Sequence, residues 1–171
     1  MSQLKNQMGA FITAEEIDGM VTDLAKQIER DYVGKDIVMI CPLKGSVLFV
    51  ADLMRKLQLP MVLDFVHLIS PRGECVRITR DIDVDITNKH VIVVEEIIDA
   101  GRTLDFLLQR LRASDPASLK VVTLLDKPAR RELPLKPDYT GRTIDDRYVV
   151  GYGLDSEEIG RNYADLYTFR N

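Results

Sequence analysis

The stretch from Val91 to Thr103 reads VIVVEEIIDAGRT and decides how the chain folds. It begins with four consecutive apolar residues, a pattern typical of a parallel β-strand that is covered on both faces. Acidic and small residues end this run. Gly101 and Thr103 then open a helix in which leucines recur along one stripe. The segment therefore predicts a strand, a turn and a helix, which together form the repeating unit of an α/β fold.

The rest of the chain repeats this alternation. Thr13 and Glu16 form a capping-box pattern at the start of a helix over residues 14–30. The predicted strands are residues 37–41, 61–69, 91–94, 119–125 and 147–150, with helices after the first and the third, and with a long loop or hairpin over 70–85. Strands that alternate with helices predict an α/β fold with a central, mainly parallel sheet flanked by helices.

The composition is that of one ordinary domain with a small partner. The 171 residues are 46% hydrophobic and 29% charged, with a net charge of -4, so we expect a single domain over 1–171. The acidic balance argues against broad nucleic-acid binding. Two cysteines, Cys41 and Cys75, are too few for a disulfide framework. Without a signal peptide pattern or an apolar stretch long enough to cross a bilayer, we expect a cytoplasmic protein.

Candidate functional residues directly follow the first apolar run, because ligands of an open α/β sheet bind at the carboxyl ends of its strands. Glu95, Glu96 and Asp99 place three carboxylates beside a helix start, whose free N–H groups and dipole attract phosphate. Gly101 allows a close backbone approach, and Thr103 adds a hydroxyl donor. Carboxylates beside a phosphate require a cation between them, usually magnesium. The pattern therefore suggests a phosphorylated sugar as the ligand.

Two familiar phosphate motifs are missing, namely the ATP-binding G-x-x-x-x-G-K-[ST] and the dinucleotide-binding G-x-G-x-x-G. Residues 91–104 instead resemble the signature of type I phosphoribosyltransferases, which bind 5-phosphoribosyl-1-pyrophosphate. Residues 41–53 (CPLKGSVLFVADL), 124–131 (LLDKPARR) and 146–155 (DRYVVGYGLD) resemble segments of the hypoxanthine-guanine branch and occur in its order. The resemblance extends over most of residues 37–161. It implies the family fold, with a small hood and a mobile active-site loop.

The resemblance also implies the reaction: transfer of the phosphoribosyl group to N9 of hypoxanthine or guanine, with release of pyrophosphate, in purine salvage. Asp99 would be the catalytic base toward the purine N7. The implied donor contacts are Lys44, Gly45, Glu95, Glu96, Asp99, Ala100, Gly101, Arg102, Thr103 and Arg161. The implied purine contacts are Lys127, Tyr148, Val149 and Asp155. The implied magnesium ligands are Glu95, Glu96 and Asp155.

Within this set, the Lys127 ammonium suits a 6-oxo group better than the amino group of adenine. Tyr148 would stack on the purine ring. The choice among hypoxanthine, guanine and xanthine stays open. In the family, the loop at Lys44 and Gly45 sometimes contains a cis peptide before the lysine. Relatives are commonly homodimers or homotetramers, so a homo-oligomer is expected.

The chain departs from the family pattern at three places. Glu96 stands where the second acid is usually Asp, Ala100 where a hydroxyl residue is usual, and Ser70-Pro71 where the active-site loop usually begins with Ser-Tyr. These departures keep open a catalytically impaired nucleotide sensor. A second alternative is a regulator that binds RNA and nucleotide. Such a regulator should have a concentrated basic face, whereas the lysines and arginines here are dispersed among acids.

Overall fold

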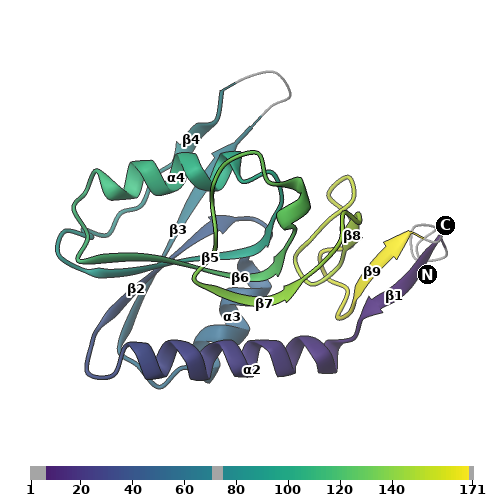
Figure 1. Cartoon of the computed structure of the whole chain (residues 1–171), viewed down its shortest axis with the longest axis horizontal. Helices are drawn as coiled ribbons and strands as arrows, with labels where there is room; N and C mark the ends of the chain where they lie inside the picture. Colours follow the sequence, from purple (N-terminus) through teal and green to yellow (C-terminus); the bar gives the residue numbers. More distant parts are fainter. Residues whose placement is uncertain (1–6, 71–74, 170–171) are drawn as a thin grey trace.

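The computed structural model describes residues 7–70 and 75–169, which form an α/β fold (Figure 1). The elements are β1 (Met8–Ile12), α2 (Ala14–Asp31), β2 (Ile37–Leu43), α3 (Val47–Lys56), β3 (Met61–Ile69), β4 (Arg77–Arg80), β5 (His90–Ile98), α4 (Arg102–Arg112), β6 (Ser118–Asp126), the 3-10 turn η1 (Pro128–Arg130), β7 (Tyr139–Thr143), β8 (Val149–Val150) and β9 (Leu166–Phe169). A six-stranded sheet has the order β4-β3-β2-β5-β6-β7, and every neighbouring pair in it is parallel except β3 with β4. A smaller antiparallel sheet has the order β1-β9-β8.

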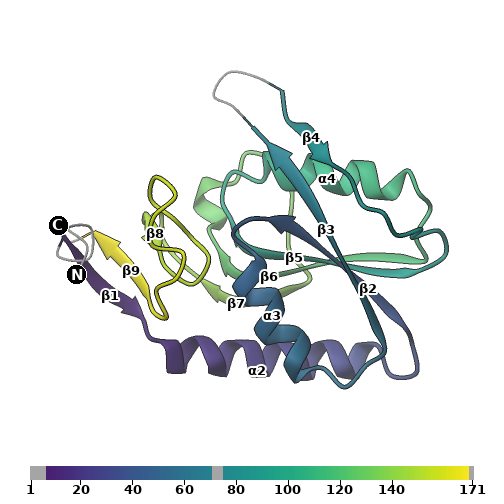
Figure 2. The ribbon, with the colours of Figure 1, turned by 180° about the vertical axis from the view of Figure 1, so that it is seen from behind.

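Both faces of the large sheet are covered, and β5 shows how the sequence achieves this. Val91 and Val93 pack in the apolar cluster that contains the buried side of α4. Ile92 and Val94 pack in the opposite cluster, with α2 and α3. All four side chains are fully buried. Figures 1 and 2 show α4 over one face and α2 and α3 over the other. The prediction of a parallel strand covered on both faces is confirmed.

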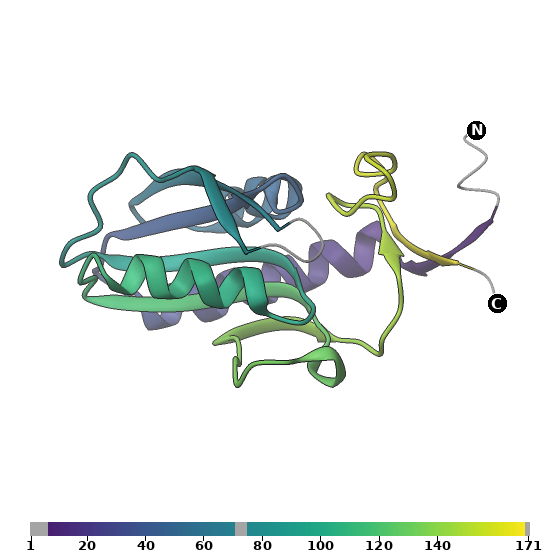
Figure 3. The ribbon, with the colours of Figure 1, turned by 90° about the horizontal axis from the view of Figure 1, so that it is seen from above.

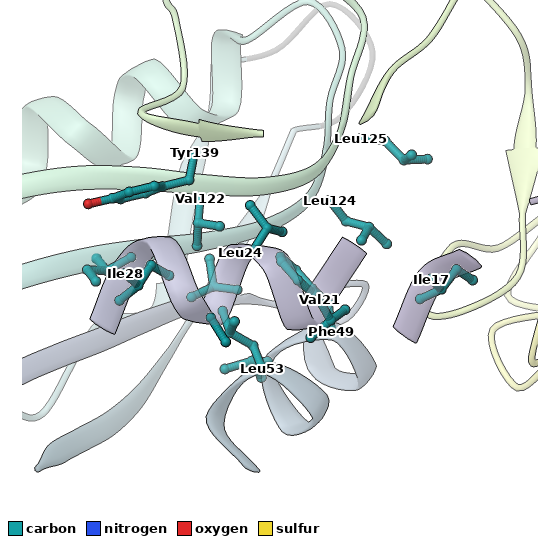
Figure 4. Packing of buried hydrophobic residues seen from close by; sticks show 14 of the residues in the cluster. Ile17, Val21, Leu24, Ile28, Phe49, Leu53, Val122, Leu124, Leu125 and Tyr139 are labelled. Carbon is teal, nitrogen blue, oxygen red and sulfur yellow. The ribbon is translucent and has the colours of Figure 1, made fainter. Parts of the chain in front are cut away.

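Helix α2 begins at the predicted capping box. Thr13 Oγ1 accepts a hydrogen bond from the Glu16 backbone N–H at 3.2 Å, and Glu16 Oε2 accepts one from the Thr13 N–H at 2.9 Å. The helix then packs its apolar stripe against α3 and the large sheet (Figure 4). The labelled members of this cluster are Ile17, Val21, Leu24, Ile28, Phe49, Leu53, Val122, Leu124, Leu125 and Tyr139. Because β1 directly precedes α2, this packing also anchors the small sheet.

The small sheet corresponds to the expected hood and lies beside one end of the large sheet (Figure 3). The prediction that residues 147–150 form the last strand was wrong. The strand there is the two-residue β8, and the last strand is β9. Neither β1 nor β9 was predicted, and neither was β7, which reads YTGRT. Since β7 is an edge strand of the large sheet, it carries no continuous apolar run that would reveal it.

Residues 70–85 were expected to form a long loop or a hairpin, and they contain one strand, β4, which pairs with the preceding strand β3. Strand β4 pairs antiparallel with β3, with Leu68 opposite Ile78 and Ile69 opposite Arg77. Pro71, at the start of the expected active-site loop, lies outside the described residues. Across the described ranges, none of the helices has the length and apolar character required to cross a bilayer.

Candidate active site

One cavity of about 480 Å³ lies where the carboxyl ends of β2 and β5 meet the start of α4. Its walls are residues 42–45, 95–98 and 100–104, together with Leu68 and Ser70 from the end of β3 and with Asp155 and Arg161 from the chain after β8. The cavity gathers nearly all of the predicted donor contacts. Those lining it are Lys44, Gly45, Glu95, Glu96, Ala100, Gly101, Arg102, Thr103 and Arg161.

The amino end of α4 forms one side of this cavity. Gly101 precedes the helix with φ 87°, a left-handed conformation that glycine adopts without strain. The first helical hydrogen bond runs from the Asp105 N–H to the Gly101 carbonyl at 2.8 Å. The N–H groups of the first turn therefore lack partners within the helix, and they can bind an anion. The Arg102 guanidinium is paired with Glu132 and is largely exposed.

Glu95 and Glu96 lie in the last part of β5, because this strand continues past the four apolar residues to Ile98. Burial and the neighbouring Glu96 charge raise the pKa of Glu95 well above its ordinary value. Burial is the main reason why the pKa of Glu96 is raised to about 7, and the Arg161 charge partly opposes this increase. Glu96 Oε2 is buried without a hydrogen-bond partner among the described residues. Cations or sugar hydroxyls would stabilise both carboxylates in their charged form.

The loop after β2 approaches these acids closely. The peptide bond between Leu43 and Lys44 is cis, the arrangement that the resemblance raised. Gly45 lies against the Glu96 carboxylate, so that a Cβ atom at position 45 would overlap it. The Gly45 carbonyl in turn lies where a Cβ atom of Gly153 would be. These two glycines therefore allow the hood and the β2 loop to meet at the cavity.

Charged side chains from the hood complete this side of the cavity. Arg161 Nη2 lies 2.8 Å from Asp155 Oδ1, and Arg161 Nη1 donates to the Gly153 carbonyl at 2.8 Å. Asp155 Oδ2 accepts a hydrogen bond from the Glu158 N–H at 2.8 Å. Lys44 Nζ lies 2.9 Å from Glu158 Oε2. The structure thus brings Lys44 and Arg161, both predicted donor contacts, into one ion-pair network.

Asp99 does not line the cavity, unlike its neighbours in sequence. Its Oδ1 lies 3.1 Å from Arg130 Nε, and its carbonyl accepts a hydrogen bond from Arg131 Nη1. Arg130 Nη1 also lies 3.5 Å from Asp146 Oδ2. The predicted base is therefore held by the segment after β6, beside the cavity.

Of the predicted purine contacts, Asp155 lines the cavity, whereas Lys127, Tyr148 and Val149 do not. Lys127 follows β6, is 6% exposed, and donates its backbone N–H to the Ile98 carbonyl at 3.0 Å. Tyr148 is 54% exposed, its ring lies 5.8 Å from the Phe169 ring, and its hydroxyl donates to the Asp155 carbonyl at 3.2 Å. Val149 is buried in β8. These residues flank the end of the large sheet without lining the cavity.

The side chains of the cavity could hold magnesium only together with ligands from a substrate. Within residues 7–70 and 75–169, no three acidic, histidine or cysteine side chains are arranged to hold a metal by themselves. Both Asp155 oxygens are engaged, one by Arg161 and one by the Glu158 N–H. The unpartnered Glu96 oxygen and the buried Glu95 fit a cation that takes its other ligands from substrate oxygens, as magnesium commonly does.

Sequence reasoning missed two residues of this site. Arg130 belongs to residues 124–131, which resemble a segment of the hypoxanthine-guanine branch, but nothing in these residues indicated a contact with Asp99. Glu158 lies three residues after Asp155 in an acidic stretch that looks like solvated surface. Both act across the fold, since Arg130 and Asp99 are 31 residues apart and Lys44 and Glu158 are 114 apart.

Comparison with known proteins decides the family. The model of the phosphoribosyl transferase domain matches residues 13–157. The chain belongs to the phosphoribosyltransferase family. The predicted fold class is confirmed.

Individual phosphoribosyltransferases match along almost their whole length. The hypoxanthine phosphoribosyltransferase of Haemophilus influenzae is 39% identical over 166 residues, which are 92% of this chain and 93% of that protein. A crystal structure of a hypoxanthine-guanine phosphoribosyltransferase from Bacillus anthracis superposes with a TM-score of 0.92 at 42% identity, covering 95% of this chain and 98% of the other. A hypoxanthine phosphoribosyltransferase structure from Staphylococcus aureus gives 0.95 at 35% identity, covering 99% and 95%.

Proposed function

We propose that this phosphoribosyltransferase acts in purine salvage and transfers the phosphoribosyl group of 5-phosphoribosyl-1-pyrophosphate to N9 of hypoxanthine or guanine. In this reaction the bond from C1 to N9 forms, the bond from C1 to pyrophosphate breaks, and the purine loses a proton. The names of the similar proteins support the enzyme over a regulator or an impaired sensor. The observation that carries the proposal is the cavity itself, where the β2 loop, two buried glutamates, the start of α4 and Arg161 meet.

The proposed donor site uses these parts separately. The first turn of α4 would bind the 5′-phosphate through its free N–H groups and the Thr103 hydroxyl. Glu95 and Glu96 would bind the ribose hydroxyls. The loop at Lys44 and Gly45, with Arg161, would stabilise the charge on the departing pyrophosphate.

Magnesium is part of the proposal. When bound, the ion would neutralise pyrophosphate charge, and Glu95 and Glu96 would hold it together with substrate oxygens. Asp155, the third ligand that the resemblance implied, would first have to release Arg161.

The proposed acceptor site lies toward Asp99. Lys127 would donate to the purine O6, Tyr148 would stack on the ring, and the Val149 backbone would contact the base edge, with Asp155 near the purine 2-position. Asp99 would take the proton at N7. Two features support this assignment: Lys127 is buried rather than solvated, and Tyr148 is 54% exposed.

The proposal also covers organisation. Residues 1–171 would form one catalytic domain, because a single apolar cluster includes both Leu24 of α2 and Leu166 of the hood. We propose a homodimer or homotetramer because members of the family commonly form these assemblies. A cytoplasmic location agrees with Cys41 and Cys75, which are unpaired.

An assay of the purified protein with 5-phosphoribosyl-1-pyrophosphate, magnesium and each of hypoxanthine, guanine, xanthine and adenine tests the proposal. We expect nucleotide formation with hypoxanthine or guanine and none with adenine. Omission of magnesium should abolish turnover. Absence of product with every base would refute the enzyme assignment.

A further inference from the structure

The carboxylate of Glu158 lies between two cations of the donor site. One oxygen, Oε2, is 2.9 Å from Lys44 Nζ and 3.5 Å from Arg161 Nη2. The Glu158 backbone is fixed as well, because its N–H donates to Asp155 and its φ of 65° places it in a tight turn. A single anionic oxygen thus faces both positive groups at once.

These two cations are the side chains assigned above to pyrophosphate. A carboxylate oxygen and a phosphate oxygen present the same charge and the same hydrogen-bond acceptors to an ammonium or a guanidinium. When pyrophosphate binds to Lys44 and Arg161, the Glu158 carboxylate has to leave the position that it occupies here. The two anions repel each other, so they compete for the same two cations.

The strength of these ion pairs suits an exchange. The side chains of Lys44 and Glu158 are 56% and 65% exposed, and exposed ion pairs are weak. A polyanion with several charges outcompetes one carboxylate for the same cations. Arg161 is only 27% exposed and also donates to the Gly153 carbonyl, a contact that does not involve Glu158, so it remains in place when Glu158 leaves.

We propose that Glu158 is an internal placeholder for pyrophosphate: its carboxylate holds Lys44 and Arg161 in position in the empty site and competes with pyrophosphate for them. The inference rests on the proposed function of this site. Glu158 is a positioning residue, since it acts through Lys44 and Arg161. Its competition weakens the binding of the donor and speeds the release of the pyrophosphate product.

The test is the affinity for magnesium pyrophosphate, measured by titration calorimetry without turnover. Glu158→Gln should bind it about two- to fivefold more tightly than the wild type, the range that an exposed ion pair allows. The matched control is Glu157→Gln, because Glu157 is the adjacent acid, is exposed and also has positive φ, yet forms no ion pair among the described residues. The control should leave the affinity unchanged.

A second comparison separates competition from a purely structural role. In a Lys44→Met background, Glu158→Gln should give a smaller gain in affinity, because one of the contested cations is gone. If Glu158→Gln lowers the melting temperature and leaves pyrophosphate affinity unchanged, Glu158 only fixes its turn and the inference is wrong. A wild type that binds no pyrophosphate also overturns it. Tighter pyrophosphate binding without turnover on any purine would support the placeholder and reject the proposed reaction.

Discussion

Arg130 Nε lies 3.1 Å from Asp99 Oδ1, and the two side chains are each about half exposed, at 50% and 46%. The ion pair raises the pKa of Arg130, with Asp99 as the main cause. The proposed base thus forms an ion pair with a cation from the segment after β6. Only Oδ1 of Asp99 forms this contact, so a base at Asp99, as proposed, would act beside the Arg130 guanidinium.

Asp99→Asn should lower kcat by about 100-fold or more, because an amide cannot accept the purine proton. The KM for the phosphoribosyl donor should change little, since Asp99 lies outside the donor cavity. Steady-state kinetics with either substrate varied gives both values. Unchanged kcat would remove Asp99 from the chemistry.

Arg130→Gln should change kcat by up to about fivefold, the range expected for a half-exposed ion pair. If Arg130 acts through Asp99, the substitution should have no effect in an Asp99→Asn background. A double-mutant cycle on kcat measures this coupling. Equal effects of Arg130→Gln in both backgrounds would show that Arg130 acts elsewhere, for example on Asp146.

Gly45→Ala should weaken donor binding by about 1–2 kcal/mol, or roughly tenfold in Kd, because the added methyl group overlaps the Glu96 carboxylate. The matched control is Gly19→Ala in α2, where a Cβ atom meets nothing within 4 Å. That control should leave donor binding intact and stabilise the helix by about 0.5–1 kcal/mol. Calorimetric titration and thermal unfolding measure the two effects. Equal donor affinity in wild type and Gly45→Ala would contradict the contact.

Ala100→Thr should strengthen donor binding, because it restores a hydroxyl that the family usually has in the phosphate loop. A hydrogen bond to a charged acceptor contributes about 1.5–3 kcal/mol. Ala100 lines the cavity beside Gly101, so the new hydroxyl lies at the phosphate site. Titration with 5-phosphoribosyl-1-pyrophosphate measures the gain in affinity. Equal affinities would show that a hydroxyl at position 100 forms no additional hydrogen bond with the phosphate.

Asp64 controls a pH-dependent part of the stability. Burial acts to raise its pKa, but hydrogen bonds from the backbone N–H groups of Val84, Phe65 and Asp83 outweigh it, so the pKa is lowered from its ordinary value of 3.8. A lowered folded pKa stabilises the protein above the unfolded pKa, and this contribution is lost as the pH falls through the folded value.

Asp64→Asn should therefore lower the free energy of unfolding at pH 7 by about 1–3 kcal/mol, and the difference from wild type should shrink below about pH 4. Denaturant unfolding at several pH values measures this. Asp36→Asn is the control, since Asp36 is exposed. A difference that stays constant down to pH 2.5 would disprove the assigned cause.

The sequence predicted those parts of the fold that repeat a local pattern. The run Val91–Val94 alternates between two covered faces, so every residue in it is apolar and the strand is evident. The capping box at Thr13 is equally local. Strand β7 escaped prediction because its hydrogen bonds at the sheet edge, and not an apolar pattern, define it.

The candidate site divides in the same way. Glu95, Glu96 and Gly101 lie in one continuous segment, and their position at the end of β5 follows from the strand and helix on either side. The contacts of Lys44 with Glu158 and of Asp99 with Arg130 could not be predicted in this way, because folding brings these residues together from distant segments. A contact between residues so far apart leaves no period or spacing in the sequence.

Gly153 of the hood lies directly against the Gly45 carbonyl of the loop after β2, so the hood and this loop are in contact at the cavity. Glycine has no side chain that could fill the space if the two segments moved apart. The shape of the cavity therefore depends on the position of the hood. Within the hood, β1 pairs with β9, and Ile12 and Leu166 of these strands pack in the apolar cluster of α2, away from the cavity. A substitution that weakens the remote β1–β9 pairing should therefore lower the affinity for the donor, although the changed residue does not line the cavity.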